Sequence, residues 1–291
     1  MAKLGLSERI YLQYLRTKFK TLALVSPNTA GKIAFDLFCT PYPKFKKRKA
    51  PAIFQQAKPL TLTLQDGIQL KGFEWTPNKS IQKTVLIAHG YASHGYKFEQ
   101  FISPLLKMGY RVLIFDAPGH GLSQGKYINI LIYLNALERI IDTFGPIDHF
   151  IGHSLGGITL AMLAENIPQP EQHKFVLIAP ATKTTTTFNN YFKMMHFNDT
   201  IKAAFLSVLA SRTNQPITHF EADRAIEKYA GPLLWVHDEE DKVCPYKDLI
   251  NFKEKAAKNI NFLITKGLGH NKVYKTQAVI DKIMSFLAPE A

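Results

Sequence analysis

Residues 150–157 of the chain read FIGHSLGG, which places Ser154 at the centre of a Gly-x-Ser-x-Gly pattern. The apolar residues before the pattern predict a strand, and residues 155–166 predict a helix. A strand that turns this sharply into a helix forces its central residue into a strained conformation, and the flanking glycines avoid collisions with neighbouring backbone. We therefore expect the turn to present Ser154 as a nucleophile. The alternative is a turn whose Gly156 and Gly157 serve only close helix packing.

Around this turn, short apolar runs alternate with helical stretches. The runs 60–65 and 68–75 flank the turn Asp66-Gly67 and predict an antiparallel hairpin. Further strands are expected at 85–88, 112–115, 150–151, 176–179, 233–236 and 260–264, and helices at about 98–108, 130–144, 155–166, 246–258 and 272–287. This alternation predicts an α/β fold with a mostly parallel, doubly wound sheet whose antiparallel strands come first.

One insert and one extension interrupt the alternation. Residues 181–230 lack a strand pattern but hold four consecutive threonines, several aromatic and Met side chains, and a helical stretch at 201–210. We expect a helical cap over the sheet edge, whose apolar side chains either line an acyl pocket or hold the cap on the core. The predicted division is a basic helical extension at 1–58, a core formed by 59–180 and 231–291, and a cap insert at 181–230.

The extension carries most of the excess positive charge. The whole chain has 36 Lys and Arg against 23 Asp and Glu, a formal net charge of +13, and residues 1–58 hold 12 of the basic and two of the acidic side chains. Residues 4–24 predict an amphipathic helix capped by Ser7. Its expected apolar side consists of Ile10, Tyr11, Tyr14, Leu15, Phe19 and Leu22. A second short helix is expected from Thr29, followed by an exposed linker at 44–49.

Three roles fit such an extension: a helix pair packed on the core, peripheral contact with an anionic membrane, or nucleic-acid binding. Each Lys or Arg near an anionic membrane surface contributes about 1 kcal/mol to attachment. No nucleic acid is expected as a partner, because no recognisable reading module accompanies the basic run. The packing and membrane roles both stay open.

The remaining composition limits the class of protein. Two cysteines, Cys39 and Cys244, are too few and too far apart for a disulfide scaffold or a zinc motif, so no metal is expected. Charges at Lys3, Glu8 and Arg9 leave no room for the apolar core of a signal peptide, and no apolar run approaches the roughly 18 residues that span a bilayer. We expect a cytoplasmic protein, or one attached peripherally to the inner membrane surface.

Two later loops carry groups that could activate a serine, which needs a base and an acid that orients the base. Asp241 follows the predicted strand 233–236, and His270 follows the predicted strand 260–264. Asp238 follows the same strand as Asp241 and is the rival acid, ahead of Glu239 and Glu240.

The chain order Ser154, Asp241, His270 resembles that of the α/β-hydrolase superfamily. His89-Gly90 and the segment 116–123 (DAPGHGLS), each placed after an earlier predicted strand, extend the resemblance over about residues 60–287. The broad pattern is similar to the monoacylglycerol lipase and serine aminopeptidase-like branch.

The resemblance implies roles for individual residues. It implies Ser154 as nucleophile, His270 as base and Asp241 as acid, because an Asp shortly before a Val and a Pro-containing turn fits the superfamily's form better at Asp241 than at Asp238. It also implies that the backbone N–H groups of Tyr91 and Leu155 form the oxyanion hole. His89, His120 and Asp116 are expected to brace their loops.

The resemblance implies a serine hydrolase that cleaves carboxylic esters through an acyl-enzyme, without a cofactor or metal. The expected substrate is a small-molecule acyl ester, and the expected character is that of a lipase, lysophospholipase or carboxylesterase. A thioesterase or acyltransferase on the same three residues is one alternative. A catalytically silent, membrane-surface binding protein on a hydrolase scaffold is the other.

Overall fold

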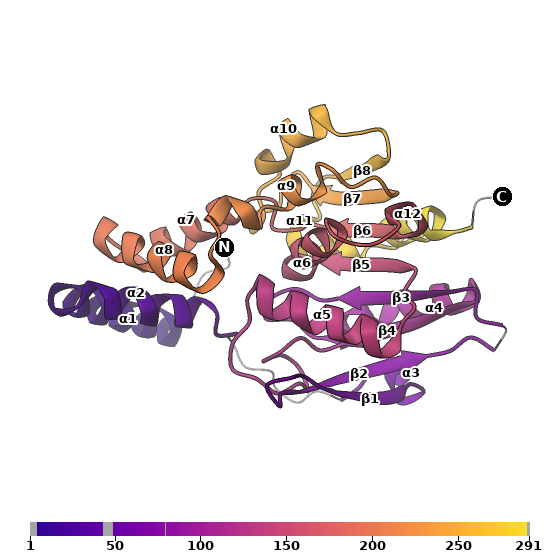
Figure 1. The fold of residues 1–291 in the computed structure, drawn as a ribbon, viewed down its shortest axis with the longest axis horizontal. Coiled ribbons are helices and arrows are strands. Elements are labelled where there is room, and N and C mark those ends of the chain that lie inside the picture. Colours follow the sequence, from indigo (N-terminus) through magenta and orange to yellow (C-terminus); the bar gives the residue numbers. More distant parts are fainter. Residues whose placement is uncertain (1–4, 43–48, 79, 290–291) are drawn as a thin grey trace. The chain divides into compact units, whose positions relative to one another are not determined.

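The structure, a computed structural model, describes residues 5–42, 49–78 and 80–289 (Figure 1). The chain forms two compact units, one of Met1–Thr40 with Lys183–Glu221 and one of Pro41–Thr182 with Ala222–Ala291. The basic run expected as an exposed linker lies, up to Arg48, outside the described residues.

The second unit is built on one eight-stranded sheet with the order β1-β2-β4-β3-β5-β6-β7-β8. Its strands are β1 Lys58–Thr63, β2 Gln69–Trp75, β3 Lys83–Ala88, β4 Tyr110–Phe115, β5 His149–His153, β6 Lys174–Ile178, β7 Leu233–Asp238 and β8 Ile260–Thr265. The pairs β1–β2 and β2–β4 are antiparallel, and every other neighbouring pair is parallel. The predicted hairpin and the mostly parallel sheet are therefore confirmed.

Helices cover both faces of this sheet (Figure 1). They are α3 Ala52–Gln55, η1 Gly95–Phe98, α4 Glu99–Lys107, α5 Ile130–Phe144, α6 Leu155–Ala164, η2 Pro170–Gln172, α9 Ala222–Ile226, α10 Lys247–Lys255, α11 Gly269–Lys272, η4 Val273–Lys275 and α12 Gln277–Leu287. On one face, Phe101 of α4 and Ile283 of α12 join Val85 and Ile87 of β3 in a hydrophobic core. On the other face, α6 is apolar on all sides and buried from Gly156 onward. This pattern is typical of a helix that packs against a sheet on one side and against other helices on the other.

The first unit brings together segments that are far apart in the sequence. It consists of α1 Leu6–Val25, α2 Pro27–Phe38, α7 Thr184–Met195, α8 Asp199–Thr213 and η3 Ile217–Phe220. Its interior is aromatic: the Phe188 ring lies 5.0 Å from both the Phe38 and the Phe205 ring, centroid to centroid. Buried Tyr191 donates its hydroxyl to the carbonyl oxygen of Ala34 at 3.0 Å. The N-terminal helices thus pack on the helices of the insert, and α9 belongs to the second unit.

Helix α1 differs from its sequence prediction in two ways. It begins at Leu6, with Gly5 rather than Ser7 at the cap position, and the Gly5 N–H donates to the Glu8 carboxylate at 2.9 Å. The single predicted apolar side is also wrong, because Phe19 is buried whereas Ile10 is exposed. Nine residues at about 100° each separate the two, which puts them on opposite sides of the helix. No helix in the described part of the chain is both long and apolar enough to cross a membrane.

Helices α2 and α8 approach each other closely at Gly31. A Cβ on Gly31 would lie 2.5 Å from the carbonyl carbon and the Cβ of Ala204. We expect Gly31→Val to force the two helices apart and to destabilise the protein by about 1–3 kcal/mol, as overpacking does. Thermal unfolding monitored by circular dichroism measures the effect.

The control for this substitution is Lys32→Val, which adds the same β-branched side chain at an exposed position of α2. It should lower the melting temperature much less. Because valine has a higher helix propensity than glycine, the close approach is the expected source of the loss at position 31, and a melting temperature of Gly31→Val that is unchanged or raised would contradict it.

Candidate functional site

Ser154 lies at the sharp turn between β5 and α6, as the sequence predicts. Its backbone has φ 54° and ψ −115°, a region that side-chain-bearing residues rarely occupy. A Cβ on Gly152 would lie 2.7 Å from the carbonyl oxygen of Gly156, and a Cβ on Gly156 would collide with the carbonyl group of Ala88. The two glycines are therefore required for β5, β3 and the start of α6 to meet at this turn.

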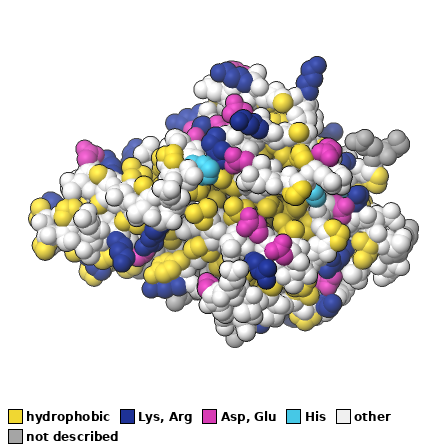
Figure 2. Space-filling model, viewed as in Figure 1, with side chains coloured by type: hydrophobic (Ala, Val, Ile, Leu, Met, Phe, Trp, Pro, Cys, Tyr) yellow, Lys and Arg dark blue, Asp and Glu magenta, His cyan; other side chains and the backbone are white. Residues whose placement is uncertain are grey.

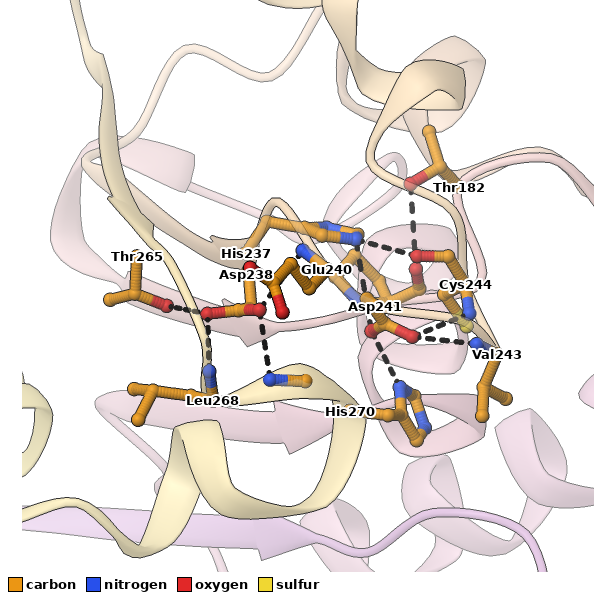
Figure 3. Close-up of polar contacts among 12 residues, drawn as sticks. Thr182, His237, Asp238, Glu240, Asp241, Val243, Cys244, Thr265, Leu268 and His270 are labelled. Atoms are coloured by element: carbon orange, nitrogen blue, oxygen red, sulfur yellow. Dashed lines mark hydrogen bonds and ion pairs between the residues drawn. The ribbon is translucent and has the colours of Figure 1, made fainter. Parts of the chain in front are cut away.

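Asp241 and His270 are directly hydrogen-bonded (Figure 3). They follow β7 and β8, parallel neighbours whose carboxyl ends share one edge of the sheet. His270 Nδ1 lies 2.7 Å from Asp241 Oδ2, and the N–H groups of Val243 and Cys244 donate to Asp241 Oδ1 at 2.8 and 2.9 Å. The carboxylate is fully buried. A carboxylate only accepts hydrogen bonds, so this contact favours the tautomer of the neutral ring that carries its proton on Nδ1 and its lone pair on Nε2.

His153 connects the serine turn to the histidine loop. Its Nε2 donates to the backbone carbonyl of His270 at 3.0 Å, and the two rings lie 4.6 Å apart, centroid to centroid. Burial, reinforced by the neighbouring His270 ring, lowers the pKa of His153 well below its ordinary value. His153 is therefore neutral, and it packs beside His270 without placing a positive charge next to that ring.

The side chain of Ser154 lies beside a thiol that the sequence analysis did not place in the site. Burial raises the pKa of Cys244, and a hydrogen bond with the Ser154 side chain offsets part of the rise. Among the described residues, no hydrogen bond joins the Ser154 hydroxyl to His270. Such contacts are often loose without substrate and tighten only in the complex. The sequence signal for Cys244 was its place in the same loop as Asp241.

The loop after β3 passes directly against the serine turn. A Cβ on Gly90 would lie 3.0 Å from both the Ser154 Cβ and His153 Nδ1, so a larger residue here would press on the serine turn. Tyr91 is the next residue along this loop. Leu155 is the first residue of α6, where N–H groups are not used by the helical ladder and the helix dipole is positive.

Two buried histidines hold the surrounding loops in place. The Ala117 N–H donates to His89 Nε2 at 2.9 Å, while His89 Nδ1 lies 2.8 Å from the carbonyl oxygen of Gly90. His120 repeats the pattern, with Nε2 accepting from the Ala92 N–H and Nδ1 bonded to a backbone carbonyl. Each ring is thus satisfied only when neutral, and burial lowers the pKa of both to about 4. In the described ranges, no group of three or more His, Cys, Asp or Glu could hold a metal ion.

Asp116 braces the next loop, which confirms its predicted role. Its carboxylate accepts from the N–H groups of Gly95 at 2.7 Å and Leu122 at 2.8 Å. Gly121 packs so tightly against this carboxylate that a Cβ there would collide with it. These bonds tie the loop after β4 to η1.

Asp238, the rival acid, has a different set of partners (Figure 3). Its two oxygens accept from the N–H groups of Glu240, Leu268 and Gly269 and from the hydroxyl of Thr265, at 2.7–3.0 Å. Burial opposes its ionisation, but these hydrogen bonds outweigh it and lower its pKa. Asp238 therefore ties the loop after β7 to the loop that carries His270.

The sheet order and the loops at its carboxyl edge agree with solved structures. An esterase from Pyrococcus furiosus superposes with a TM-score of 0.62 over 86% of this chain and 97% of its own, at 20% sequence identity. The chain has the α/β-hydrolase fold. The predicted fold class is thereby confirmed.

Sequence comparisons find similar proteins that are named as hydrolases. Residues 79–216 of this chain match the serine aminopeptidase family, S33. A serine hydrolase-like protein of Dictyostelium discoideum is 28% identical over 62% of this chain and 55% of its own length. A monoacylglycerol lipase of Mycolicibacterium smegmatis is 28% identical over 40% of this chain and 44% of its own. The chain thus spans about half the length of these curated relatives.

We expect the free energy of unfolding to fall as the pH is lowered from about 6.5 to about 5. Burial lowers the pKa of His89, His120 and His149 to about 4, so the unfolded chain takes up protons in this range that the folded chain does not. The stability is therefore complete above about pH 6.5 and declines below it, by about 2 kcal/mol per histidine at about pH 5. Chemical unfolding across this range measures the slope.

His149→Gln provides the control for the pH experiment. His149 lies at the start of β5, distant along the strand from the serine turn, and its Nδ1 bonds the carbonyl oxygen of Asp148. The variant should show a shallower decline in stability than the unsubstituted chain. Stability that stays constant between about pH 7 and pH 5 would contradict the assignment of neutral, buried histidines.

Proposed function

We propose that this α/β hydrolase is a serine hydrolase that cleaves carboxylic esters, with Ser154 as nucleophile, His270 as general base and Asp241 as the orienting acid. Water is the proposed acceptor of the acyl group. The proposed oxyanion hole consists of the backbone N–H groups of Tyr91 and Leu155.

The observation that carries the proposal is the 2.7 Å bond between His270 Nδ1 and Asp241 Oδ2 beside the serine turn. This bond selects the tautomer in which His270 Nε2 has a free lone pair, the form that a general base needs. His153 is the chain neighbour of Ser154 and donates to the backbone carbonyl of His270, so it keeps the base near the nucleophile. The strained Ser154 backbone supports the same role.

The proposed reaction has two steps. In the first, the Ser154 hydroxyl turns from Cys244 to His270 Nε2, loses its proton there and attacks the ester carbonyl, and His270 then protonates the leaving alcohol. The N–H groups of Tyr91 and Leu155 stabilise the negative oxygen of the tetrahedral intermediate, and one such donor typically contributes about 3 to 4 kcal/mol. In the second step, His270 activates a water molecule that releases the acid.

The substrate class is proposed from the relatives. A monoacylglycerol lipase and an esterase are among the similar proteins, and both names describe action on acyl esters. We propose a small-molecule ester with a medium or long acyl chain. A series of p-nitrophenyl esters of increasing acyl length measures this preference, and an added alcohol acceptor separates hydrolysis from acyl transfer.

Ser154→Ala should lower ester turnover at least about a thousandfold and abolish labelling by a fluorophosphonate probe, because the variant lacks the attacking oxygen. The fold should be retained, since alanine keeps the Cβ and fills the same backbone position. Turnover of a short p-nitrophenyl ester, probe labelling and the melting temperature are measured together.

Ser285→Ala is the matched control, because Ser285 lies on α12 and donates only to the carbonyl of Asp281. It should react like the unsubstituted chain. Substantial ester turnover by folded Ser154→Ala would overturn the nucleophile assignment, and an unsubstituted chain without turnover or labelling would overturn the proposed activity.

The two aspartates should separate activity from stability. Asp241→Asn should lower kcat about a thousandfold or more, because the amide no longer selects the required tautomer of His270. Asp238→Asn should lower kcat less than about tenfold but destabilise the fold by about 1–3 kcal/mol, because an amide nitrogen cannot accept hydrogen bonds from Thr265 and Leu268. Steady-state kinetics and chemical unfolding of both variants measure these two effects. If Asp238→Asn lost more kcat than Asp241→Asn, Asp238 rather than Asp241 would be the orienting acid.

A further inference from the structure

Helix α1 has an inner face that is fully used within the first unit. Phe19 is 1% exposed, and its ring meets the Phe197 ring edge-on at 5.0 Å between centroids. The Arg16 guanidinium donates to the carbonyl oxygen of Met194 at 2.7 and 3.1 Å, near the end of α7. These contacts fix which side of α1 faces outward.

The outward side of α1 is also apolar. Its five large apolar side chains are Leu6, Ile10, Tyr14, Leu24 and Val25, which are 58–84% exposed. At about 100° per residue they fall within an arc of about 100° centred opposite Phe19. We call these five residues the outer stripe. Single exposed apolar residues are ordinary on a protein surface, but several on one side of a helix, here interrupted by Thr17 and Thr21, indicate an interaction site.

Basic side chains border the outer stripe on both edges. At helical spacing, Lys18 falls on one edge and Arg9 and Lys20 fall on the other, and all three are exposed. The one acid of α1, Glu8, falls on the opposite side of the helix and accepts from the Gly5 N–H. Figure 2 shows hydrophobic and basic side chains next to each other over the part of the molecule that α1 and α2 form.

The same side of α1 holds a shallow, open groove between side chains of this helix alone. The groove has a volume of about 490 Å³ and is lined by Tyr14, Thr17, Lys18, Thr21, Leu22 and Val25. Its walls are methyl and methylene groups, the Tyr14 ring and one ammonium group.

We propose that α1 lies in the surface of an anionic lipid bilayer, with the outer stripe inserted at the level of the headgroups and upper acyl chains. A helix with an apolar side bordered by Lys and Arg binds in this way, because the cations reach the lipid phosphates while their alkyl stems lie along apolar surface. Charge complementarity favours lipid over a second copy of the chain, since the first unit carries ten Lys and Arg against four Asp and Glu. The proposal is independent of the proposed ester hydrolysis.

Vesicle co-sedimentation of the full chain tests the proposal. The vesicles are phosphatidylcholine alone or an equimolar mixture of phosphatidylcholine and phosphatidylserine. The protein should sediment with the mixed vesicles at low salt and be progressively released as salt is added, because the screening length falls to about 8 Å at physiological ionic strength. Vesicles without phosphatidylserine should retain much less protein.

Paired variants identify the surface. Ile10→Ser with Leu24→Ser removes two members of the outer stripe and should weaken binding at least about tenfold. Ile81→Ser with Ile250→Ser removes two exposed apolar side chains of the second unit and should leave binding unchanged. Lys18→Gln with Lys20→Gln should weaken binding and flatten its salt dependence.

Charge-matched controls and folding checks complete the test. Lys107→Gln with Lys253→Gln makes the same change in net charge at exposed positions of the second unit and should bind like the unsubstituted chain. All variants should keep their melting temperature and their turnover of a short, soluble ester. If the unsubstituted chain and all variants lack ester turnover, the proposed ester hydrolysis is contradicted and the membrane proposal is not affected.

Three results would overturn the membrane proposal. The first is binding that the stripe variant leaves unchanged. The second is an equal loss in the two pairs of Lys variants, which would show attraction by net charge only. The third is no vesicle binding together with self-association of the chain, seen by sedimentation velocity and abolished by the stripe variant, which would assign the outer stripe to contact between two copies.

Discussion

The left-handed backbone of Ser154 is the constraint on which the arrangement of the site depends. A side-chain-bearing residue at φ 54° is kept in place only because its surroundings leave it no alternative. Here those surroundings are Gly152, Gly156 and Gly90, whose missing side chains let three backbone segments meet within van der Waals distance. The same close approach brings the loop after β3 against the start of α6, so a substitution at any of these glycines would disturb several strands at once.

Hydrogen-bond satisfaction, rather than charge, organises the polar groups around this turn. His89 and His120 are each held between an N–H donor and a carbonyl acceptor, an arrangement that only a neutral ring can satisfy. Asp238 and Asp241, three residues apart, are both buried, yet one accepts from the His270 loop's backbone and the other from the His270 ring. Two similar carboxylates are therefore separated in role by the groups that face them.

Much of the fold could be predicted from local patterns. The hairpin around Asp66-Gly67, the parallel strands and the helix after Ser154 all follow from periodicity and turn residues, and the acid that contacts His270 was the one that the superfamily's form favoured. Local patterns could not show which side chains and backbone groups contact one another in the folded chain. Ile10 and Phe19 are both apolar in sequence, and the packing of α1 against Phe197, between α7 and α8, shows which of them is buried. The four donors to Asp238 and the place of Cys244 beside Ser154 likewise depend on loops that meet only in the folded chain.

The composition of the first unit has a consequence for how the chain is synthesised. Helices α1 and α2 are translated before their packing partners α7 and α8, which emerge only after the segment from Pro41 to Thr182. At ribosomal rates this delay is on the order of ten seconds. During that time the inner face of α1, with Phe19 at its centre, has no native surface to cover it and is open to chaperones or to the membrane. Helices α1 and α2 are therefore made before α7 and α8 but reach their native packing only after them.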